Sequence, residues 1–235
     1  MNAFVDPVGA RLPRLEAREK ATGTARYLDD HTRPGMLFAA IAQSPYAHAR
    51  IRGYDVTKAK ALPGVKAIVT GGDLPLRRVG GMIKDETMLA VGKVRYIGEP
   101  VAAVAARDRK TARLAAQLIE IDYEPLPTVL TIDEALADGA PILHEEFASY
   151  VRAMDGNSRG NMIWESQLAE GDVDSAWARC DVVVEATYRT PAQYHAYMEP
   201  NGALAEVDGN GRITVLATCQ SAHHVQTRVA DELGL

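Results

Sequence analysis

The sequence is poor in cysteine. Its 235 residues include only Cys180 and Cys219, which are too few for a disulfide framework and are typical of a reducing compartment. No stretch approaches the roughly 18 uninterrupted apolar residues of a membrane span. The first twenty residues carry acidic and basic side chains throughout and have no apolar core, so they do not form a secretory signal. We therefore expect a cytoplasmic protein without a membrane segment.

A basic excess is also missing. The chain has 26 lysine and arginine residues against 31 aspartate and glutamate residues, a net charge of −5, which argues against nucleic-acid binding. The dinucleotide-binding, phosphate-loop, paired-cysteine, nucleophile-elbow and zinc-protease motifs do not occur. The pairs Gly71-Gly72 and Gly80-Gly81 are not followed by a helix, so turn chemistry explains them better than a phosphate cradle.

What is present is ordinary globular composition, with 47% hydrophobic and 24% charged residues. Apolar runs and β-branched segments predict short strands, and spacings of three and four predict helices between them. The fold class is therefore α/β, in the mixed α+β sense. Strands are expected at residues 36–42, 47–56, 65–70, 88–91, 94–97, 101–106 and 119–123. Helices are expected at residues 58–62, from residue 108 onward, and at residues 132–137. Thr57 is expected to cap the first of these helices, and the capping box of Thr131 and Glu134 the last.

Composition shifts predict four parts. Residues 1–21 are polar and without period, and are expected to be an extended N-terminal arm. Residues 22–137 form the first domain, and residues 138–165, with the polar run 155–161, form a linker. Residues 166–235 are the start of a second domain, which is expected to be completed by sequence outside this chain.

The second domain has sharp local patterns. Asp172 is expected to cap a helix that places Cys180 in the core, and residues 181–190 alternate as a half-buried strand does. Residues 198–207 and 212–218 are predicted to be a strand pair around the turn 208–211. Ser221 is expected to cap a final helix with Ala222, Val225, Val229 and Leu233 on its inner face.

Each candidate metal-binding or reactive residue also has a structural interpretation. His195 and Glu199 are four apart, but Pro200 follows at once, so a hydrogen-bonded histidine in a loop is favoured over a metal pair. His223 and His224 are adjacent and point in different directions on a helix, so we expect one solvated and one partly packed ring. Cys219 precedes a helix N-terminus, where a thiol pKa can fall, but a structural thiol is favoured. No metal ligands are assigned.

Four ordered phrases resemble one family, the large molybdenum-cofactor subunits of the xanthine dehydrogenase and aldehyde oxidase type. They are residues 18–27 (REKATGTARY) with 44–51 (SPYAHARI), residues 94–104 (VRYIGEPVAAV), residues 121–127 (IDYEPLP) and residues 193–200 (QYHAYMEP). The resemblance covers about residues 12 to 235. It implies that the first domain is an α/β hammerhead domain and that residues 166–235 begin a molybdopterin-binding domain.

The resemblance also implies a cofactor-binding residue. The segment Thr218-Cys219-Gln220 is similar to a Ser-Thr-Gln phrase whose glutamine hydrogen-bonds an oxygen ligand of molybdenum, which points to Gln220. A neutral amide donor suits a site whose charge changes during turnover. Cys219 departs from the phrase. The family's glycine-rich cofactor loop and its general-base glutamate do not occur here, so no catalytic residue is expected within this chain.

The resemblance to this family also implies a function. The chain is expected to be the N-terminal part or a split subunit of a hydroxylase that adds a water-derived oxygen to an aldehyde or N-heterocycle. The implied cofactor is molybdenum-molybdopterin, in its cytosine dinucleotide form, with 2Fe-2S and FAD on partner chains. Its implied partners are the rest of the molybdopterin domain, the 2Fe-2S subunit, the FAD subunit and a small-molecule substrate. The alternative is a non-catalytic subunit-contact module or remnant, because an unfinished sheet edge favours pairing with another chain.

Overall fold

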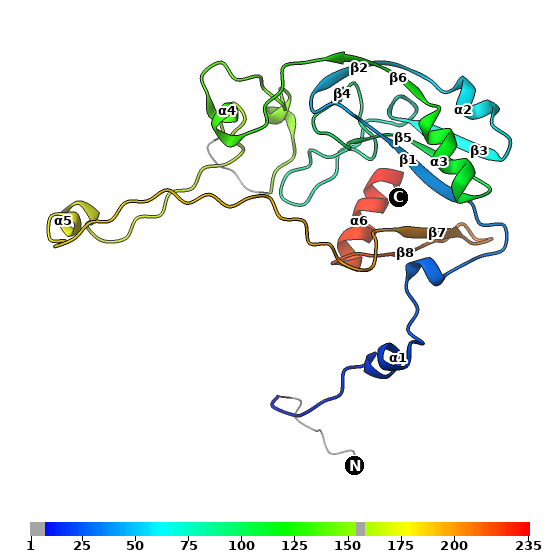
Figure 1. The fold of residues 1–235 in the computed structure, drawn as a ribbon, viewed down its shortest axis with the longest axis horizontal. Coiled ribbons are helices and arrows are strands. Elements are labelled where there is room, and N and C mark those ends of the chain that lie inside the picture. Colours follow the sequence, from blue (N-terminus) through cyan, green and yellow to red (C-terminus); the bar gives the residue numbers. More distant parts are fainter. Residues whose placement is uncertain (1–7, 154–157) are drawn as a thin grey trace. The chain divides into compact units, whose positions relative to one another are not determined.

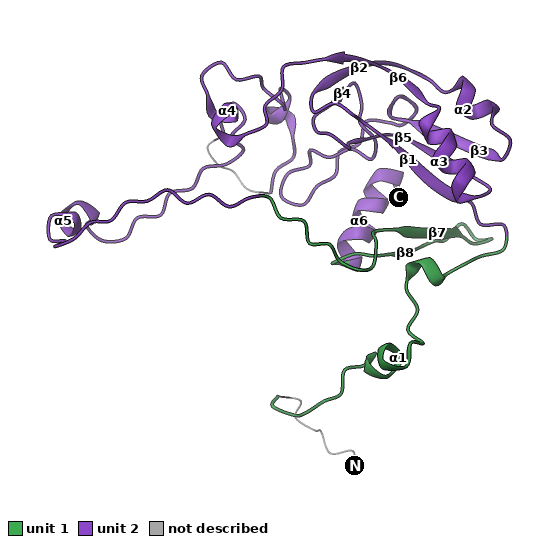
Figure 2. Cartoon of the chain, in the orientation of Figure 1, with its two compact units in different colours: residues 1–34, 192–221 green, residues 35–191, 222–235 purple. Residues whose placement is uncertain are grey.

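The computed structural model describes residues 8–153 and 158–235, so residues 154–157 of the predicted linker lie outside the described residues. The chain forms two compact units, coloured separately in Figure 2. One unit combines Met1–Pro34 with Ala192–Ser221, and the other combines Gly35–Pro191 with Ala222–Leu235. In the part of the chain that the structure describes, no helix is both long and apolar enough to cross a bilayer.

The larger unit is built around β5 (Pro100–Ala106), the central strand of an antiparallel sheet with the order β1-β5-β3. The outer strands are β1 (Phe38–Gln43) and β3 (Val65–Thr70), and all three match the sequence prediction closely. Alanine and valine dominate β5, and these small side chains allow a helix and a second sheet to pack closely against it (Figure 1).

A second antiparallel sheet has the order β4-β2-β6, with β2 (Ala49–Asp55) in the centre. Its edges are β4 (Lys93–Val94) and β6 (Glu120–Pro125). The strand predicted at 94–97 is therefore reduced to β4, and the strand predicted at 88–91 is not formed. Ala90 instead donates its N–H to the carbonyl of Pro100, a single bond that does not extend into a ladder.

Helix α3 (Arg109–Gln117) packs on β1 and β5 and fully buries Ala112 and Ala115. Asp108 caps it, as predicted, with its Oδ1 accepting the Thr111 N–H at 2.7 Å. The shorter α2 (Thr57–Ala61) begins one residue earlier than expected. The N-cap residue is Val56, which has no side-chain capping bond, so the prediction that Thr57 caps this helix is wrong; Asp55 Oδ1 accepts the Thr57 N–H at 2.8 Å just before it.

Two apolar clusters meet at β5. One cluster contains Ala102 and Val104 with residues of α2 and α3, and the other contains Val101 with Ala49 and Val94 of the second sheet. Successive residues of a strand point to opposite faces, so one strand supplies both clusters. This arrangement joins the two sheets into one core.

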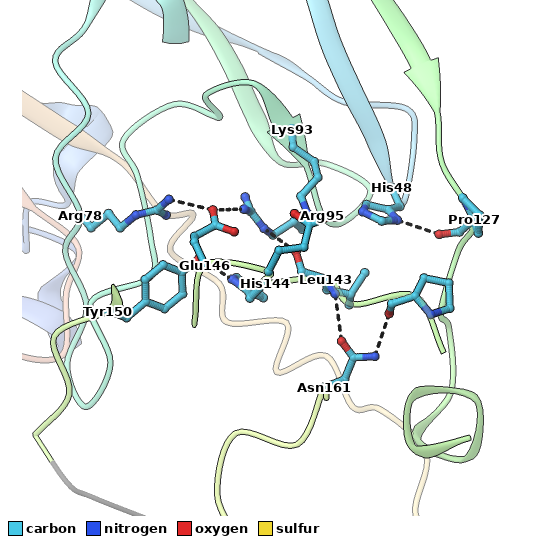
Figure 3. Close-up of polar contacts among 12 residues, drawn as sticks. His48, Arg78, Lys93, Arg95, Pro127, Leu143, His144, Glu146, Tyr150 and Asn161 are labelled. Carbon is cyan, nitrogen blue, oxygen red and sulfur yellow. Dashed lines mark hydrogen bonds and ion pairs between the residues drawn. The ribbon is translucent and has the colours of Figure 1, made fainter. Parts of the chain in front are cut away.

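The segment from Pro141 to Arg152 is held by charged side chains of residues 78–95 (Figure 3). Glu146 Oε1 accepts from Arg78 at 2.9 Å and from Arg95 at 2.7 Å. Asn161 Oδ1 accepts the Leu143 N–H at 2.9 Å. The segment carries a short 3₁₀ helix (Phe147–Ser149) and follows α4 (Ile132–Leu136), whose capping box of Thr131 and Glu134 is confirmed. The domain and linker boundaries given above stay predictions.

The alternating segment 181–190 is not a strand in this structure. It follows α5 (Val173–Trp177), which Asp172 caps as predicted, and it runs extended without a ladder partner. Val182, Val184 and Tyr188 are 78%, 83% and 89% exposed. A strand needs a neighbour to satisfy its backbone, and within the described residues no segment is hydrogen-bonded to this one through its backbone. Cys180 is likewise exposed, so its prediction as a core thiol is wrong.

The smaller unit contains a hairpin of β7 (Ala203–Val207) and β8 (Ile213–Ala217), which confirms the predicted pair. Asp208 Oδ1 accepts the N–H groups of Asn210 and Arg212 at 2.9 Å each, which explains the tight turn. The unit also holds α1 (Ala17–Thr22), in a segment expected to be extended, and a 3₁₀ helix (Leu28–Asp30).

The last helix is α6 (Ala222–Leu233), which belongs to the larger unit. Asp231 pairs with Lys84 at 3.0 Å, and Arg228 pairs with Glu86 at 3.2 Å. Its predicted inner face is only partly covered, since Val225 and Val229 are half-buried while Ala222 and Leu233 are exposed.

Candidate cofactor site

Gln220 lies in the connection between β8, which ends at Ala217, and α6, which starts at Ala222. This is the strand-to-helix position that the sequence predicted. The residue is exposed, and the structure records no hydrogen bond of its side-chain amide among the described residues. Its amide is therefore available to both donate and accept.

The backbone before Gln220 is fixed at Thr218. The Thr218 N–H donates to the Gly202 carbonyl at 3.1 Å, and the Gly202 N–H donates to Thr218 Oγ1 at 2.9 Å. These bonds hold the end of β8 to the start of β7. Sequence reasoning singled out the phrase 218–220 but gave no role to Thr218.

Gln220 borders an open hollow of about 920 Å³ within the smaller unit. Three stretches of the chain line it: residues 16–31, residues 195–201 and residues 216–220. The lining mixes neutral donors with charged groups, among them Lys20, Arg26, His195, Asn201 and Gln220. The hollow therefore offers hydrogen-bond donors to a polar ligand.

One wall of the hollow comes from the N-terminal segment. The Leu28 N–H donates to Glu199 Oε1 at 3.1 Å, and Arg33 Nε donates to Glu206 Oε2 at 2.9 Å. Gly202 packs so closely on Leu28 that an added Cβ would lie 2.6 Å from Leu28 Cδ2. No local sequence signal could reveal this wall, because it joins residues that are 171 positions apart.

Glu16 and Glu199, two of the three glutamates that line the hollow, are already engaged. Hydrogen bonds from the backbone, Arg14 and Lys20 lower the pKa of Glu16 to about 2, so it is ionised at neutral pH. Lys20 Nζ lies 3.2 Å from Glu16 Oε1. Glu199 receives the Leu28 amide, which leaves Gln220 as a neutral, unengaged donor beside these pairs.

His195 and Glu199 lie in a loop, not on a helix, so their spacing does not align them. Ala196 between them has a φ of 50°, a left-handed conformation that is uncommon for alanine. The His195 ring packs against Tyr197 with centroids 6.1 Å apart. Across residues 8–153 and 158–235, no group of three or more histidine, cysteine or acidic side chains is arranged to hold a metal ion.

Cys219 is exposed, so the preference for a structural thiol is wrong. His223 and His224 are both exposed in the first turn of α6, where one partly packed ring was expected. Gly71 and Gly72 were expected in a turn but begin a 3₁₀ helix (Gly71–Asp73), and Gly80 and Gly81 lie in a loop. The first glycine of each pair lies close to backbone: a Cβ on Gly71 would lie 2.0 Å from the Ala90 oxygen, and one on Gly80 would lie 1.8 Å from the Ile83 oxygen.

Two family models match the chain in sequence order. Residues 22–127 match the α/β hammerhead domain of aldehyde oxidase and xanthine dehydrogenase, and residues 155–235 match the molybdopterin cofactor-binding domain. The chain is 34% identical over 229 residues to the nicotinate dehydrogenase large molybdopterin subunit of Eubacterium barkeri, covering 97% of this chain and 51% of that protein. It is also 34% identical to the carbon monoxide dehydrogenase large chain of Afipia carboxidovorans, covering 97% of this chain and 29% of that one.

Solved structures of enzymes of the same kind also align with this chain. The carbon monoxide dehydrogenase of Oligotropha carboxidovorans aligns with a TM-score of 0.86 at 33% identity, over 97% of this chain and 29% of that one. Quinoline 2-oxidoreductase of Pseudomonas putida 86 aligns with a TM-score of 0.81 at 30% identity, over 95% of this chain and 28% of that one. The chain thus spans about half or less of the length of these relatives.

Proposed function

Because the chain belongs to the xanthine dehydrogenase and aldehyde oxidase family of molybdenum enzymes, we propose that it is the N-terminal part, or a split subunit, of a molybdenum-cofactor hydroxylase. The observation that carries this proposal is the free amide of Gln220 at the border of the hollow, within the segment that matches the cofactor-binding domain. The α/β hammerhead domain precedes it in the same chain.

The donor set fits the proposed group. A molybdopterin complex presents oxygen ligands at the metal and polar edges on the pterin, and Gln220 can donate to such an oxygen without adding charge. Asn201 and Lys20 line the same hollow, but the Asn201 amide donates to Tyr197 Oη at 3.4 Å and Lys20 is paired with Glu16, so Gln220 is the unengaged amide there. When bound, the group supplies oxygen transfer to a carbon centre and accepts the electrons. The residues of this chain hold and orient it.

We propose that the substrate class is an aldehyde or an N-heterocycle with an electron-poor carbon. Relatives named for nicotinate, quinoline and xanthine support the heterocycle, and those named aldehyde oxidoreductase support the aldehyde. The general-base glutamate is expected outside this chain, and the proposed cofactor form is the cytosine dinucleotide.

Electrons need carriers that this chain does not supply. A 2Fe-2S cluster takes four protein ligands, usually cysteines, and this sequence has two cysteines that lie apart from each other. We therefore propose a 2Fe-2S subunit and an FAD subunit as partners, together with the remaining part of the molybdopterin-binding domain.

The test is metal analysis and cofactor extraction on the protein purified with its associated subunits. We expect about one molybdenum and one pterin per copy of this chain, the stoichiometry of one cofactor per large subunit. Gln220→Ala should lower the turnover of the assembled enzyme, whereas Gln226→Ala, an exposed glutamine on α6, should not. Assembly with partners in the absence of molybdenum would contradict the proposal and favour a non-catalytic contact module.

A further inference from the structure

The β7–β8 ladder ends in an unusual way, one residue pair beyond its last regular pair, Ala203 with Ala217. In an antiparallel sheet, two residues of a hydrogen-bonded pair exchange both N–H···O=C bonds. Gly202 and Thr218 form one of these bonds, from the Thr218 N–H to the Gly202 carbonyl. The second bond runs from the Gly202 N–H to the hydroxyl of Thr218, not to its carbonyl.

The Thr218 hydroxyl thus takes the place of its own backbone carbonyl. It accepts from Gly202 N at 2.9 Å and lies 3.4 Å from the Gly202 carbonyl oxygen, to which it can donate. Because the Gly202 N–H donates to the Thr218 hydroxyl, the Thr218 carbonyl does not accept a ladder hydrogen bond from Gly202. The backbone can then leave the sheet at this residue and carry Cys219 and Gln220 to the hollow.

Gly202 suits the other side of this contact. It has no side chain, and its Cα lies against Leu28, where an added Cβ would meet Leu28 Cδ2 at 2.6 Å. Leu28 is itself held by Glu199. The position of Thr218 is therefore defined by the β7–β8 hairpin and by the N-terminal wall together.

We propose that Thr218 is a positioning residue for Gln220: its hydroxyl ends the ladder and sets the direction in which the Gln220 amide faces the hollow. The proposal rests on the function proposed above, in which Gln220 contacts the cofactor. It predicts that the orientation of Gln220 depends on the hydroxyl of Thr218 and not on its methyl group. Serine at this position should therefore keep the arrangement and valine should lose it.

The first experiment uses the full chain without cofactor and follows amide exchange and backbone chemical shifts by NMR. In Thr218→Val, the Gly202 amide loses its acceptor, and its exchange should become about fivefold faster, the factor that corresponds to one net hydrogen bond. The shifts of Cys219 and Gln220 should move. Thr218→Ser should match the parent chain, and so should Thr214→Val, the same substitution at an exposed position of β8. If Thr218→Val does not fold, Thr218→Ala carries the same comparison.

The second experiment uses the assembled enzyme. Thr218→Val should lower turnover about as much as Gln220→Ala while retaining molybdenum, and the double variant should lose little more, because both changes act on one group. Unmoved shifts of Cys219 and Gln220 in Thr218→Val, or additive losses in the double variant, would overturn the proposal. If no molybdenum is found, the proposed function fails, and the NMR comparison still decides whether Thr218 sets this loop.

Discussion

The backbone amide of Leu28 donates to the Glu199 carboxylate at 3.1 Å. Leu28 lies in the range that matches the hammerhead model, and Glu199 lies in the range that matches the cofactor-binding model. The segment around Leu28 therefore packs against the residues that lead into the β7–β8 hairpin, within the smaller unit. This contact makes the segment part of the wall beside Gln220.

Removing this acceptor should loosen the N-terminal wall. Glu199→Ala leaves the Leu28 amide without its partner, and we expect a loss of about 1 kcal/mol in unfolding free energy, a value typical of one hydrogen bond. Glu199→Gln keeps an acceptor oxygen and should lose less. Denaturant unfolding with amide exchange at Leu28 measures both effects. Equal losses for the two variants would mean that the carboxylate acts through its charge and not through this bond.

Glu146 should make stability depend on acid pH. Burial alone would raise its pKa, but a backbone hydrogen bond and the charges of Arg95 and Arg78 outweigh burial, so the pKa lies below its usual 4.5. A lowered folded-state pKa gives stability that is complete above about pH 4.5 and is lost as pH falls through the folded-state pKa.

The measurement is the unfolding free energy of the parent chain and of Glu146→Gln between neutral pH and acid pH. The variant should be less stable at neutral pH, and the difference should shrink below the usual carboxyl range. Glu185→Gln, an exposed glutamate in the extended segment, is the matched control and should follow the parent chain throughout. A constant difference at all pH values would exclude ionisation of Glu146 as the cause.

The larger sheet could be predicted because its information is local. The β-branched run of β3 and the alanine and valine run of β5 determine those strands, and Asp108 determines where α3 begins. Gln220 was located by a motif, and its strand and helix flanks were found by periodicity. The strand at 181–190 could not be settled in this way, because alternation shows that a segment suits a sheet but not whether a neighbouring strand is there.

The wall beside Gln220 was beyond sequence reasoning for a different reason. The contact of Leu28 with Glu199 depends on the tertiary path of the chain, and neither residue has an unusual neighbour in sequence. The role of Thr218 was also hidden, since a threonine at a strand end is ordinary and only the geometry shows its hydroxyl replacing a carbonyl.

The contrast between the core and the extended segment gives a direct test. Val104 is 1% exposed in β5, whereas Val184 is 83% exposed. Val104→Ala should destabilise the chain by about 2 kcal/mol, because it removes buried methyl groups and leaves a cavity. Val184→Ala is the same substitution and should stay within about 0.5 kcal/mol of the parent chain. Thermal unfolding measures both. A comparable loss for Val184→Ala would show that residues 181–190 pack against a neighbour in solution.

The glycine pairs allow a test of close backbone packing. A Cβ on Gly71 would lie 2.0 Å from the carbonyl oxygen of Ala90, whereas a Cβ on Gly81 would meet nothing within 4 Å. Gly71→Ala should therefore push the backbone of Ala90 away and destabilise the larger unit by about 2 kcal/mol, within the range of overpacked sites. Gly81→Ala should change the unfolding free energy by no more than about 0.5 kcal/mol, as is usual for a surface position. Ala90 donates its N–H to the Pro100 carbonyl, so displacement of the Ala90 backbone should also weaken this bond and speed amide exchange at Ala90. This effect is expected in Gly71→Ala and not in Gly81→Ala. Equal stability of the two variants would mean that the backbone near Gly71 yields to a side chain, and that packing does not require glycine at this position.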